Sequence, residues 1–493
     1  MKMSTLEEEN ALLIEGNQCG VQENRDCASG KKWRFVIIEP IMLLYTFAEI
    51  GLIPITQQYL YSRFGNMSYL QNSSQCSENT SNPHQKEIDY MQEETSKWSQ
   101  YIEIAYSSLA CILVPVIGTY VDTAGRRVAL LVPCFFALLQ SIFLSVIIYF
   151  HLPVYCLVFV KLLQGIGSWE VVLMVMYTLL SDTTKPSERA IRMTITQGIY
   201  IVSTAVSEAA VGFWIQNSGY LYPCICMAAL LGLNWLYVYF LVPETLDLEV
   251  APNVDRTVLS SCTFEQRIRS LVAVLRRNEN GRRVRIIVLN ILVFLYVFPS
   301  FSSVAIIMLI MMDTPLCWGP LKIGIYQAVY ALILPAMSIP GIKMFKICLS
   351  EISISCIGIM SSMASFIVLY LITAGWGMYL ACAVNGFSMM TLAIFRAMLS
   401  KIVESHERGK IFALVALVEA VCGLIASPSN NAVYRMTVSY APRTVFLMNF
   451  AFVVVAQFFV IFYMCYVKRL RRFKYHTEED RLHYQRSSMT QPL

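Results

Sequence analysis

A stretch of 44 residues, Ile352–Phe395, contains no aspartate, glutamate, lysine or arginine. A helix of about 20 apolar residues crosses the hydrocarbon core of a bilayer, so this stretch is long enough for two crossings. Turn residues at Thr373–Gly375 separate them. Only 14% of the 493 residues are charged, against about 25% in soluble domains. The sequence therefore predicts a polytopic helical membrane protein and excludes a soluble enzyme.

Apolar stretches of this kind recur twelve times along the chain. They cover residues 35–59, 102–121, 128–150, 154–180, 194–215, 220–242, 285–311, 321–344, 352–373, 376–399, 411–434 and 444–467. The predicted fold class is an all-α membrane protein with twelve transmembrane helices in two six-helix halves. The predicted segments are a tail (1–33), a first half (34–242) with a long loop (60–101), a basic linker (243–284), a second half (285–467) and a C-terminal tail (468–493).

The distribution of lysine and arginine predicts the orientation of the spans. With the N-terminus in the cytosol, 26 of these residues flank the spans on the cytosolic side and 6 lie in the opposite loops. Cytosolic loops carry the excess of positive charge, so both termini are expected in the cytosol.

The long loop 60–101 is then lumenal or extracellular, and its N-glycosylation patterns agree with this placement. Asn66, Asn72 and Asn79 each open an N-glycosylation pattern, although a loop rich in Asn and Ser also produces such patterns by chance. Cys76 and Cys317 are the two cysteines squarely in loops on this side, where an oxidising compartment would let them pair. Other cysteines near the same face leave the pairing open.

The loop between the second and third spans carries a G-x-x-x-D-x-x-G-R-R pattern, formed by Gly118, Asp122, Gly125, Arg126 and Arg127. A carboxylate, a turn glycine and two arginines at this spacing can form a charge clasp that closes in one conformation and breaks in another. The alternative is that the arginines only follow the charge rule.

This pattern resembles the signature loop of the major facilitator superfamily. Pro243, Glu244 and Thr245, after the sixth span, resemble the second cytosolic signature of the same superfamily. That layout of two six-helix halves joined by a basic linker is typical of these transporters.

A narrower resemblance lies in four segments, Ile38–Pro40, Pro54–Leu60, Thr314–Trp318 and Phe395–Ile402. They are similar to solute carrier family 46, the family of the proton-coupled folate transporter and the thymic stromal cotransporter. The resemblance implies a disulfide between Cys76 and Cys317, and a role in substrate and proton handling for Arg396.

The same resemblance assigns a basic position on the fourth span to Lys161. It also shows three departures from the family pattern, one of which is a loop histidine whose position falls near Gln266 and Arg267. Gln197 occupies the position of a carboxylate that is tied to proton coupling, and Ser300 occupies that of a histidine. Neither residue can titrate, which argues against folate as the solute.

Ionisable and polar residues inside the spans are candidate functional residues, because they are costly in a bilayer. The candidates for contact with solute are Arg396, Lys161, Gln197, Asn385 and Ser388. The candidates for proton coupling are Glu208, Glu170, Glu49 and Glu419. Glu208 lies on the same helical face as Gln197, so it could supply the missing acid. The alternatives are that Arg396 snorkels to the cytosolic surface and that Lys161 only pairs with a neighbouring carboxylate.

The predicted function is secondary active transport of polar, anionic organic solutes by alternating access, coupled to protons. Catalytic, ATP-binding and metal-ligand patterns are absent from the sequence, so we expect no enzymatic activity, cofactor or metal. The alternatives are an uncoupled facilitative transporter and a transporter-like receptor or scaffold that moves nothing. The expected partners are the solute, protons and the bilayer, without nucleic acid.

The N-terminal tail contains Glu8, Leu12 and Leu13, which resemble an acidic dileucine sorting signal. Sorting adaptors are therefore further expected partners. The expected location is the plasma membrane or an endolysosomal membrane.

Overall fold

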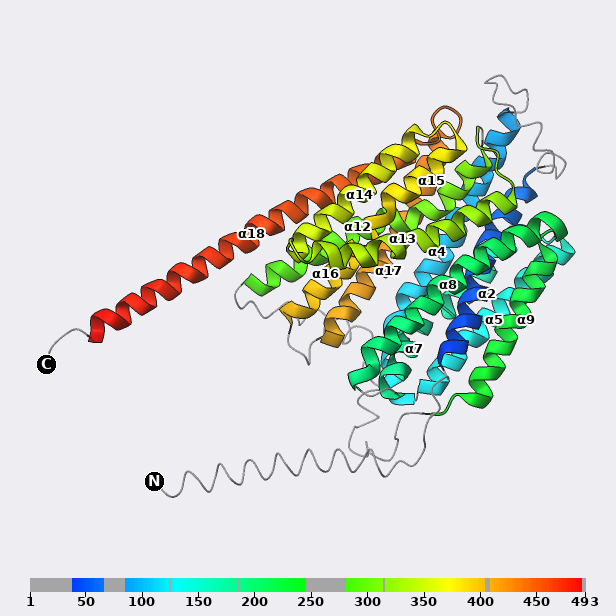
Figure 1. Cartoon of the computed structure of the whole chain (residues 1–493). Helices are drawn as coiled ribbons and strands as arrows, with labels where there is room; N and C mark the ends of the chain where they lie inside the picture. The colour runs from blue at the N-terminus through cyan, green and yellow to red at the C-terminus, as the bar shows by residue number, and fades with distance from the viewer. Residues whose placement is uncertain are drawn as a thin grey trace. The chain divides into compact units, whose positions relative to one another are not determined.

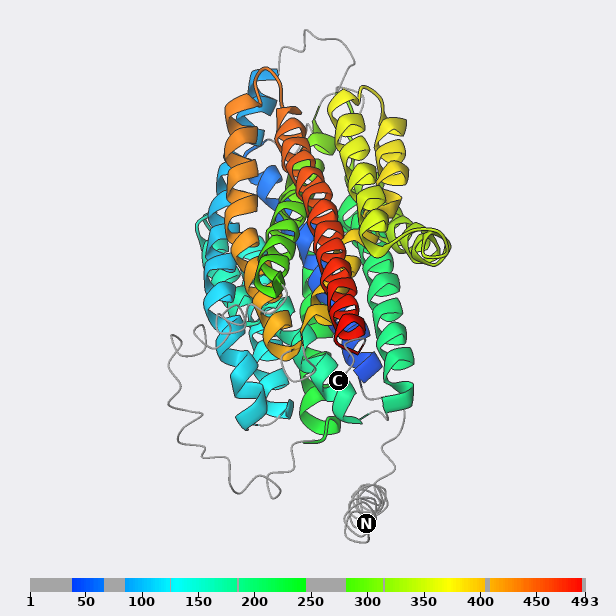
Figure 2. The same cartoon turned by 90° about the vertical axis from the view of Figure 1, so that its left-hand side faces the viewer.

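The computed structural model describes residues 38–65, 85–124, 126–183, 186–244, 281–313, 315–403 and 408–489. All of them belong to one compact unit, Ile38–Leu493. Within these ranges the secondary structure is helical, without a strand (Figures 1 and 2). The helices are α2 (Ile38–Arg63), α4 (Gln85–Ala124), α5 (Arg126–Phe150), α6 (Cys156–Ile166), α7 (Trp169–Thr183), α8 (Pro186–Ser218), α9 (Leu221–Leu241), α12 (Arg282–Met312), α13 (Pro320–Phe345), α14 (Glu351–Leu371), α15 (Gly375–Val384), the 3₁₀ helix η2 (Asn385–Phe387), α16 (Met389–Ile402), α17 (Arg408–Thr437) and α18 (Thr444–Met489).

The predicted spans correspond to these helices in order. In the portion of the chain that the structure describes, eleven helical segments are long and apolar enough to cross a membrane. One of them joins α6 to α7, and another joins α15, η2 and α16. Helix α4 covers the remaining predicted span, 102–121. The prediction of an all-α membrane protein is confirmed.

Three helices extend beyond the predicted spans. Helix α8 begins at Pro186 and α18 continues to Met489 (Figure 1). Helix α4 begins at Gln85, inside the predicted loop 60–101. Its first turns are polar, which made them resemble a loop in the sequence. They fold because polar side chains such as Gln92 and Ser96, at helical spacing, are buried against another helix.

The two halves contact one another mainly through two helix pairs, α4 with α17 and α8 with α13 (Figure 2). In the first pair, Ser96 Oγ donates a hydrogen bond of 2.9 Å to the backbone oxygen of Asn431. Tyr434 Oη donates to Gln92 Oε1 nearby. These residues lie toward the end of the bundle where α4 and α13 begin and α17 ends, which we call the Trp318 end.

The second pair approaches backbone to backbone at two glycines. A Cβ atom added to Gly324 would lie 2.5 Å from the backbone oxygen of Glu208 and 3.0 Å from Cα of Gly212. One added to Gly212 would lie 2.6 Å from the backbone oxygen of Pro320. Small residues let helices in a membrane pack this closely. Gly212 and Gly324 therefore hold the halves together near the Trp318 end.

Within the second half, buried apolar side chains form a core. Leu292 of α12, Ile359 of α14, Phe395 of α16, Cys422 of α17 and Val453 of α18 belong to it. This core fixes α12, which carries Tyr296 and Ser300, and α16, which carries Arg396.

Gly324→Ala should weaken the contact between the halves, because the added methyl group would overlap the backbone of α8. The measurement is oxidative cross-linking of Ser96→Cys to Asn431→Cys, in the variant and in the parent. We expect the cross-linking yield to fall by roughly half or more. Gly198→Ala on α8 is the matched control, since an added Cβ there meets nothing within 4 Å. An unchanged yield in Gly324→Ala would contradict this account.

Candidate solute site

Two of the spans are interrupted. The fourth span breaks between α6 and α7, and the tenth passes through the 3₁₀ helix η2 between α15 and α16. The fourth and tenth spans occupy corresponding positions in the two six-helix halves. Interruptions at corresponding positions of two repeats are typical of the binding site in transporters built this way.

Hydroxyl groups from neighbouring helices stabilise the interruption of the tenth span. Ser338 Oγ donates a hydrogen bond of 2.8 Å to the backbone oxygen of Gly386. Tyr296 Oη donates one of 2.5 Å to the backbone oxygen of Ser388. A carbonyl that leaves the regular helix must find another donor, because lipid offers none. These bonds place Asn385 and Ser388 on a fixed wall.

In the fourth span, Gly167 marks the interruption. A Cβ atom there would lie 2.6 Å from the backbone oxygen of Pro133, so only glycine fits against α5. Tyr45 Oη donates 2.9 Å to the Gly167 oxygen, and its ring stacks on Trp169 with centroids 5.9 Å apart. Helix α7 then begins with Glu170 in its first turn, where the helix dipole favours a negative charge.

A cavity of about 240 Å³ lies among α4, α7, α12 and α17, and we call it the between-halves cavity. Three carboxylates line it, Glu103 and Glu170 from the first half and Glu419 from the second. Tyr106 Oη donates 3.0 Å to Glu170 Oε2. The structure thus brings together two of the four predicted proton-coupling candidates, Glu170 and Glu419.

Arg396, the predicted solute-binding arginine, forms an ion pair at the edge of this cavity. Its Nη2 atom donates a hydrogen bond of 2.6 Å to Glu419 Oε1. The side chain of Arg396 is 45% exposed and that of Glu419 is 18% exposed. The guanidinium therefore keeps donors that a further anion could reach.

Lys161 and Glu49 belong to a buried polar network in the first half. Lys161 Nζ donates a hydrogen bond of 2.6 Å to Gln164 Oε1, and Gln164 Nε2 in turn donates one of 2.6 Å to Glu49 Oε1. Gln140 Nε2 also donates to both oxygens of Glu49, at 2.9 and 2.8 Å. Lys161 thus reaches Glu49 through an intervening carboxamide, and neither residue lines the between-halves cavity.

Gln197 and Glu208 have different surroundings although they share a helix. Gln197 Oε1 accepts a 2.8 Å bond from Tyr177 Oη. Glu208 is buried at the contact with α13, and its Oε2 has no hydrogen-bond partner among the described residues. It lines neither the between-halves cavity nor the pocket described next.

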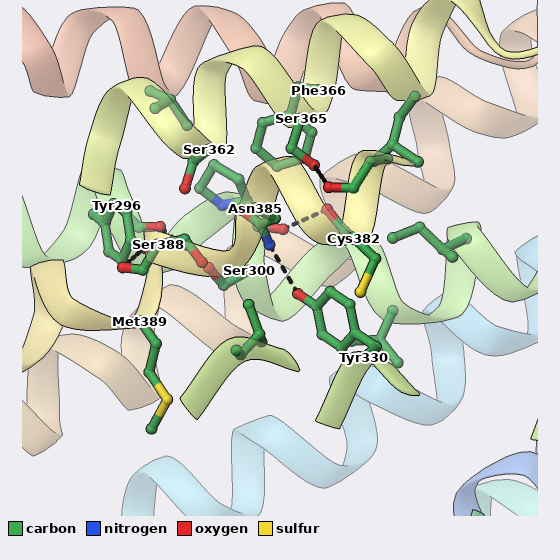
Figure 3. Close-up of a pocket in the computed structure, with 18 of the residues that line it drawn as sticks. Tyr296, Ser300, Tyr330, Ser362, Ser365, Phe366, Cys382, Asn385, Ser388 and Met389 are labelled. Carbon is green, nitrogen blue, oxygen red and sulfur yellow. Dashed lines mark hydrogen bonds between the residues drawn. The ribbon is translucent and has the colours of Figure 1, made fainter. Parts of the chain in front are cut away.

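A second cavity of about 260 Å³ lies within the second half, and we call it the C-half pocket (Figure 3). Helices α12, α13 and α14 and the interrupted tenth span surround it. Asn385 and Ser388, two predicted solute-contact residues, line it together with Tyr296 and Tyr330. Asn385 Nδ2 donates 3.2 Å to Tyr330 Oη.

The two signature segments meet at the opposite end of the bundle, which we call the Arg127 end. The backbone N–H groups of Arg126 and Arg127 donate to the Glu244 carboxylate at 2.7 and 3.2 Å. Arg127 also donates to the backbone oxygen of Tyr239, and its guanidinium lies 5.5 Å from the centroid of that ring. Glu244 therefore caps the N-terminus of α5, and Pro243 precedes it half-buried.

Several predicted residues lie outside the described portion of the chain. Gly118 and Asp122 lie in α4, but their side chains are not among those described. Cys317 is disulfide-bonded, whereas its expected partner Cys76 lies outside the described residues. The others outside are Gly125 and Thr245 of the signatures, Asn66, Asn72 and Asn79 of the glycosylation patterns, and Glu8, Leu12 and Leu13 of the sorting signal. These assignments stay predictions.

Sequence reasoning missed Glu103 and Tyr106. Glu103 lies at the edge of the predicted span 102–121, where an acidic residue is unremarkable in a sequence. Its spacing from Tyr106 and Ala110, three and seven residues on, places all three on one face of α4. That face lines the between-halves cavity. The helical spacing of these three residues is therefore the sequence feature from which a shared polar face could be predicted.

Comparison with known proteins finds relatives that match this chain over most of its length and most of theirs. The chain is 26% identical over 428 residues to the lysosomal proton-coupled steroid conjugate and bile acid symporter SLC46A3 of Gallus gallus, a match that covers 84% of this chain and 91% of that protein. It is 25% identical over 417 residues to the proton-coupled folate transporter of Rattus norvegicus, covering 84% and 88%.

Solved structures agree on the fold. The human organic anion transporter MFSD10 (TETRAN) superposes with a TM-score of 0.59 at 14% identity, over 86% of this chain and 98% of that one. The peptide transporter POT in complex with sulfate superposes with a TM-score of 0.61 at 12% identity, over 91% and 98%. Residues 40–427 match the model of the Major Facilitator Superfamily. With most of its length covered by that model, the chain belongs to the Major Facilitator Superfamily of transporters.

Proposed function

We propose that this chain is a secondary active transporter of polar, anionic organic solutes that works by alternating access and is coupled to protons. The observation that carries the proposal is the ion pair between Arg396 and Glu419 at the edge of the between-halves cavity. The pair joins a group that can bind an anion to a group that can bind a proton.

The pair provides a physical route to coupling. An arginine stays ionised at physiological pH, so Arg396 always needs an anionic partner. A solute anion competes with Glu419 for this guanidinium. A proton on Glu419 removes its charge and weakens the pair, which frees Arg396 for the solute. Proton binding and anion binding then favour one another, and this linkage is reciprocal.

The relatives support this class of solute. Those compared above carry the names of a proton-coupled steroid conjugate and bile acid symporter and of a proton-coupled folate transporter. Steroid conjugates and bile acids are organic anions, and they are our first candidates for transport. Folate is a weaker candidate, because Gln197 and Ser300 replace titratable residues of the family pattern.

We further propose that both termini lie in the cytosol, which assigns the Arg127 end to the cytosolic side. The excess of lysine and arginine supports this assignment. The contacts between α4 and α17 and between α8 and α13 would then close the lumenal side. On that side we place the glycosylated asparagines Asn66, Asn72 and Asn79 and the Cys76–Cys317 disulfide. The dileucine pattern favours an endolysosomal membrane over the plasma membrane.

Uncoupled facilitative transport is the second candidate. The observation in its favour is Gln197, which is neutral and already bonded to Tyr177 where the family pattern has an acid. A receptor or scaffold that moves no solute is the third candidate, and measured flux separates it from the other two.

Substitution of Arg396 tests anion recognition. Arg396→Lys keeps the charge but loses the planar pair of donors, so we expect KM for an anion to rise about tenfold, the worth of one charged hydrogen bond. Arg396→Ala should nearly abolish uptake. The measurement is uptake of radiolabelled estrone sulfate, taurocholate and folate into proteoliposomes. Lys401→Ala is the control, because this basic residue of α16 pairs with Glu351 away from the cavities. Normal uptake by Arg396→Ala would contradict the proposal.

Substitution of Glu419 tests proton coupling. In the unchanged protein, an inward proton gradient should drive accumulation of the anion. Glu419→Gln mimics the protonated acid, so uptake should no longer respond to the gradient, while exchange of internal for external anion persists. Glu351→Gln, which removes a carboxylate from a different ion pair, should keep the response. Gradient-driven accumulation by Glu419→Gln would show that coupling lies elsewhere.

A further inference from the structure

The C-half pocket differs in chemistry from the between-halves cavity. Among the described residues that line it, none is an aspartate, glutamate, lysine, arginine or histidine. Its polar groups are hydroxyls and carboxamides, such as those of Ser300, Gln327 and Asn385. A buried charge without a partner is costly, whereas a neutral group with hydrogen-bond acceptors can be satisfied here. The pocket therefore favours an uncharged occupant.

Two donors in the pocket remain available to such an occupant. Tyr330 Oη accepts a bond from Asn385, and its own hydroxyl proton has no acceptor among the described residues. The Gln327 carboxamide likewise has no partner within the described ranges. Small-molecule sites commonly combine apolar walls with a few polar groups of this kind.

One wall of the pocket is aromatic. The rings of Tyr326 and Tyr330 stack with centroids 6.3 Å apart and planes inclined by 29°. Phe366 and Tyr296 line other regions of the pocket (Figure 3). Such surfaces pack well against a ring system. The volume of about 260 Å³ lies just below the range of typical small-molecule sites, about 300 to 1,000 Å³, so the pocket suits one part of a solute.

Arg396 stands between the two cavities. Met389 and Leu392 of α16 line the C-half pocket, and Arg396 follows Leu392 on the same helical face, about 6 Å along the axis. On its other side Arg396 bonds Glu419, which lines the between-halves cavity. A solute whose anionic group reaches Arg396 can thus place its uncharged ring system in the C-half pocket, a single helical turn away.

The geometry points to the C-half pocket as a binding subsite for the uncharged ring system of the transported solute, with its hydrogen-bond acceptors on Tyr330 and Gln327. The role of Arg396 as the partner of the anionic group rests on the proposed function above. The subsite itself is independent of that charge, and a neutral ring compound should occupy it alone.

Estrone and estrone sulfate form a matched pair of probes, because they share one ring system and differ in the anionic group. The first measurement is binding of tritiated estrone to the purified full-length protein in lipid nanodiscs. We expect saturable binding that weakens at least tenfold in Ser300→Trp, which fills the pocket. Ile291→Trp, on the same helix but outside the lining of both cavities, is the control for added bulk.

Tyr330→Phe is the conservative second variant and keeps the test decisive if Ser300→Trp fails to fold. It removes one hydrogen bond, so estrone affinity should fall about fivefold. Absence of saturable estrone binding, or equal affinity in Tyr330→Phe and the parent, would overturn the subsite.

Arg396→Ala separates this inference from the proposed function. Estrone binding should persist in this variant, while uptake of estrone sulfate falls. If estrone sulfate uptake persists as well, the charge recognition is wrong and the subsite stands. If estrone binding is lost with the arginine, the pocket is not a separate subsite and the inference fails.

Discussion

A backbone carbonyl that leaves a regular helix inside a bilayer finds no water to bond, and the architecture around the tenth span follows from that constraint. At the 3₁₀ helix η2, the Ser338 hydroxyl of α13 bonds the Gly386 oxygen, and the Tyr296 hydroxyl of α12 adds a second bond to the Ser388 oxygen, which also accepts from the Thr391 N–H. Each bond fixes a neighbouring helix against the interruption. The same bonds leave a space behind it, lined by hydroxyls and rings, which is the C-half pocket.

The same constraint shapes the charged groups. Glu49 is buried but receives bonds from two glutamines, and Arg396 is held by Glu419. Among the described residues, three carboxylates nevertheless line the between-halves cavity, with the Arg396 guanidinium at its edge. A cavity with this balance holds an anion more readily after it has taken up protons, which is the direction of coupling proposed here.

Sequence reasoning predicted the membrane spans because their apolar length is a local property. It missed the first turns of α4, since Gln92 and Ser96 are buried by α17, more than 300 residues away, and no local pattern reveals that partner. It identified Arg396 and Glu419 separately, because spacing along one helix cannot show a pair between two helices. Glu208 shares a helical face with Gln197 and stays a candidate for the missing acid, although it lines neither of the two cavities.

Helix α18 leaves the bundle as one continuous element. Its membrane-spanning segment is Thr444–Arg469, and the helix continues without a break to Met489. At 1.5 Å per residue, the last twenty residues make a rod of about 30 Å. The length of this part of α18 is thus set by helical geometry. Met489 is therefore held about 30 Å beyond Arg469 along the axis of α18.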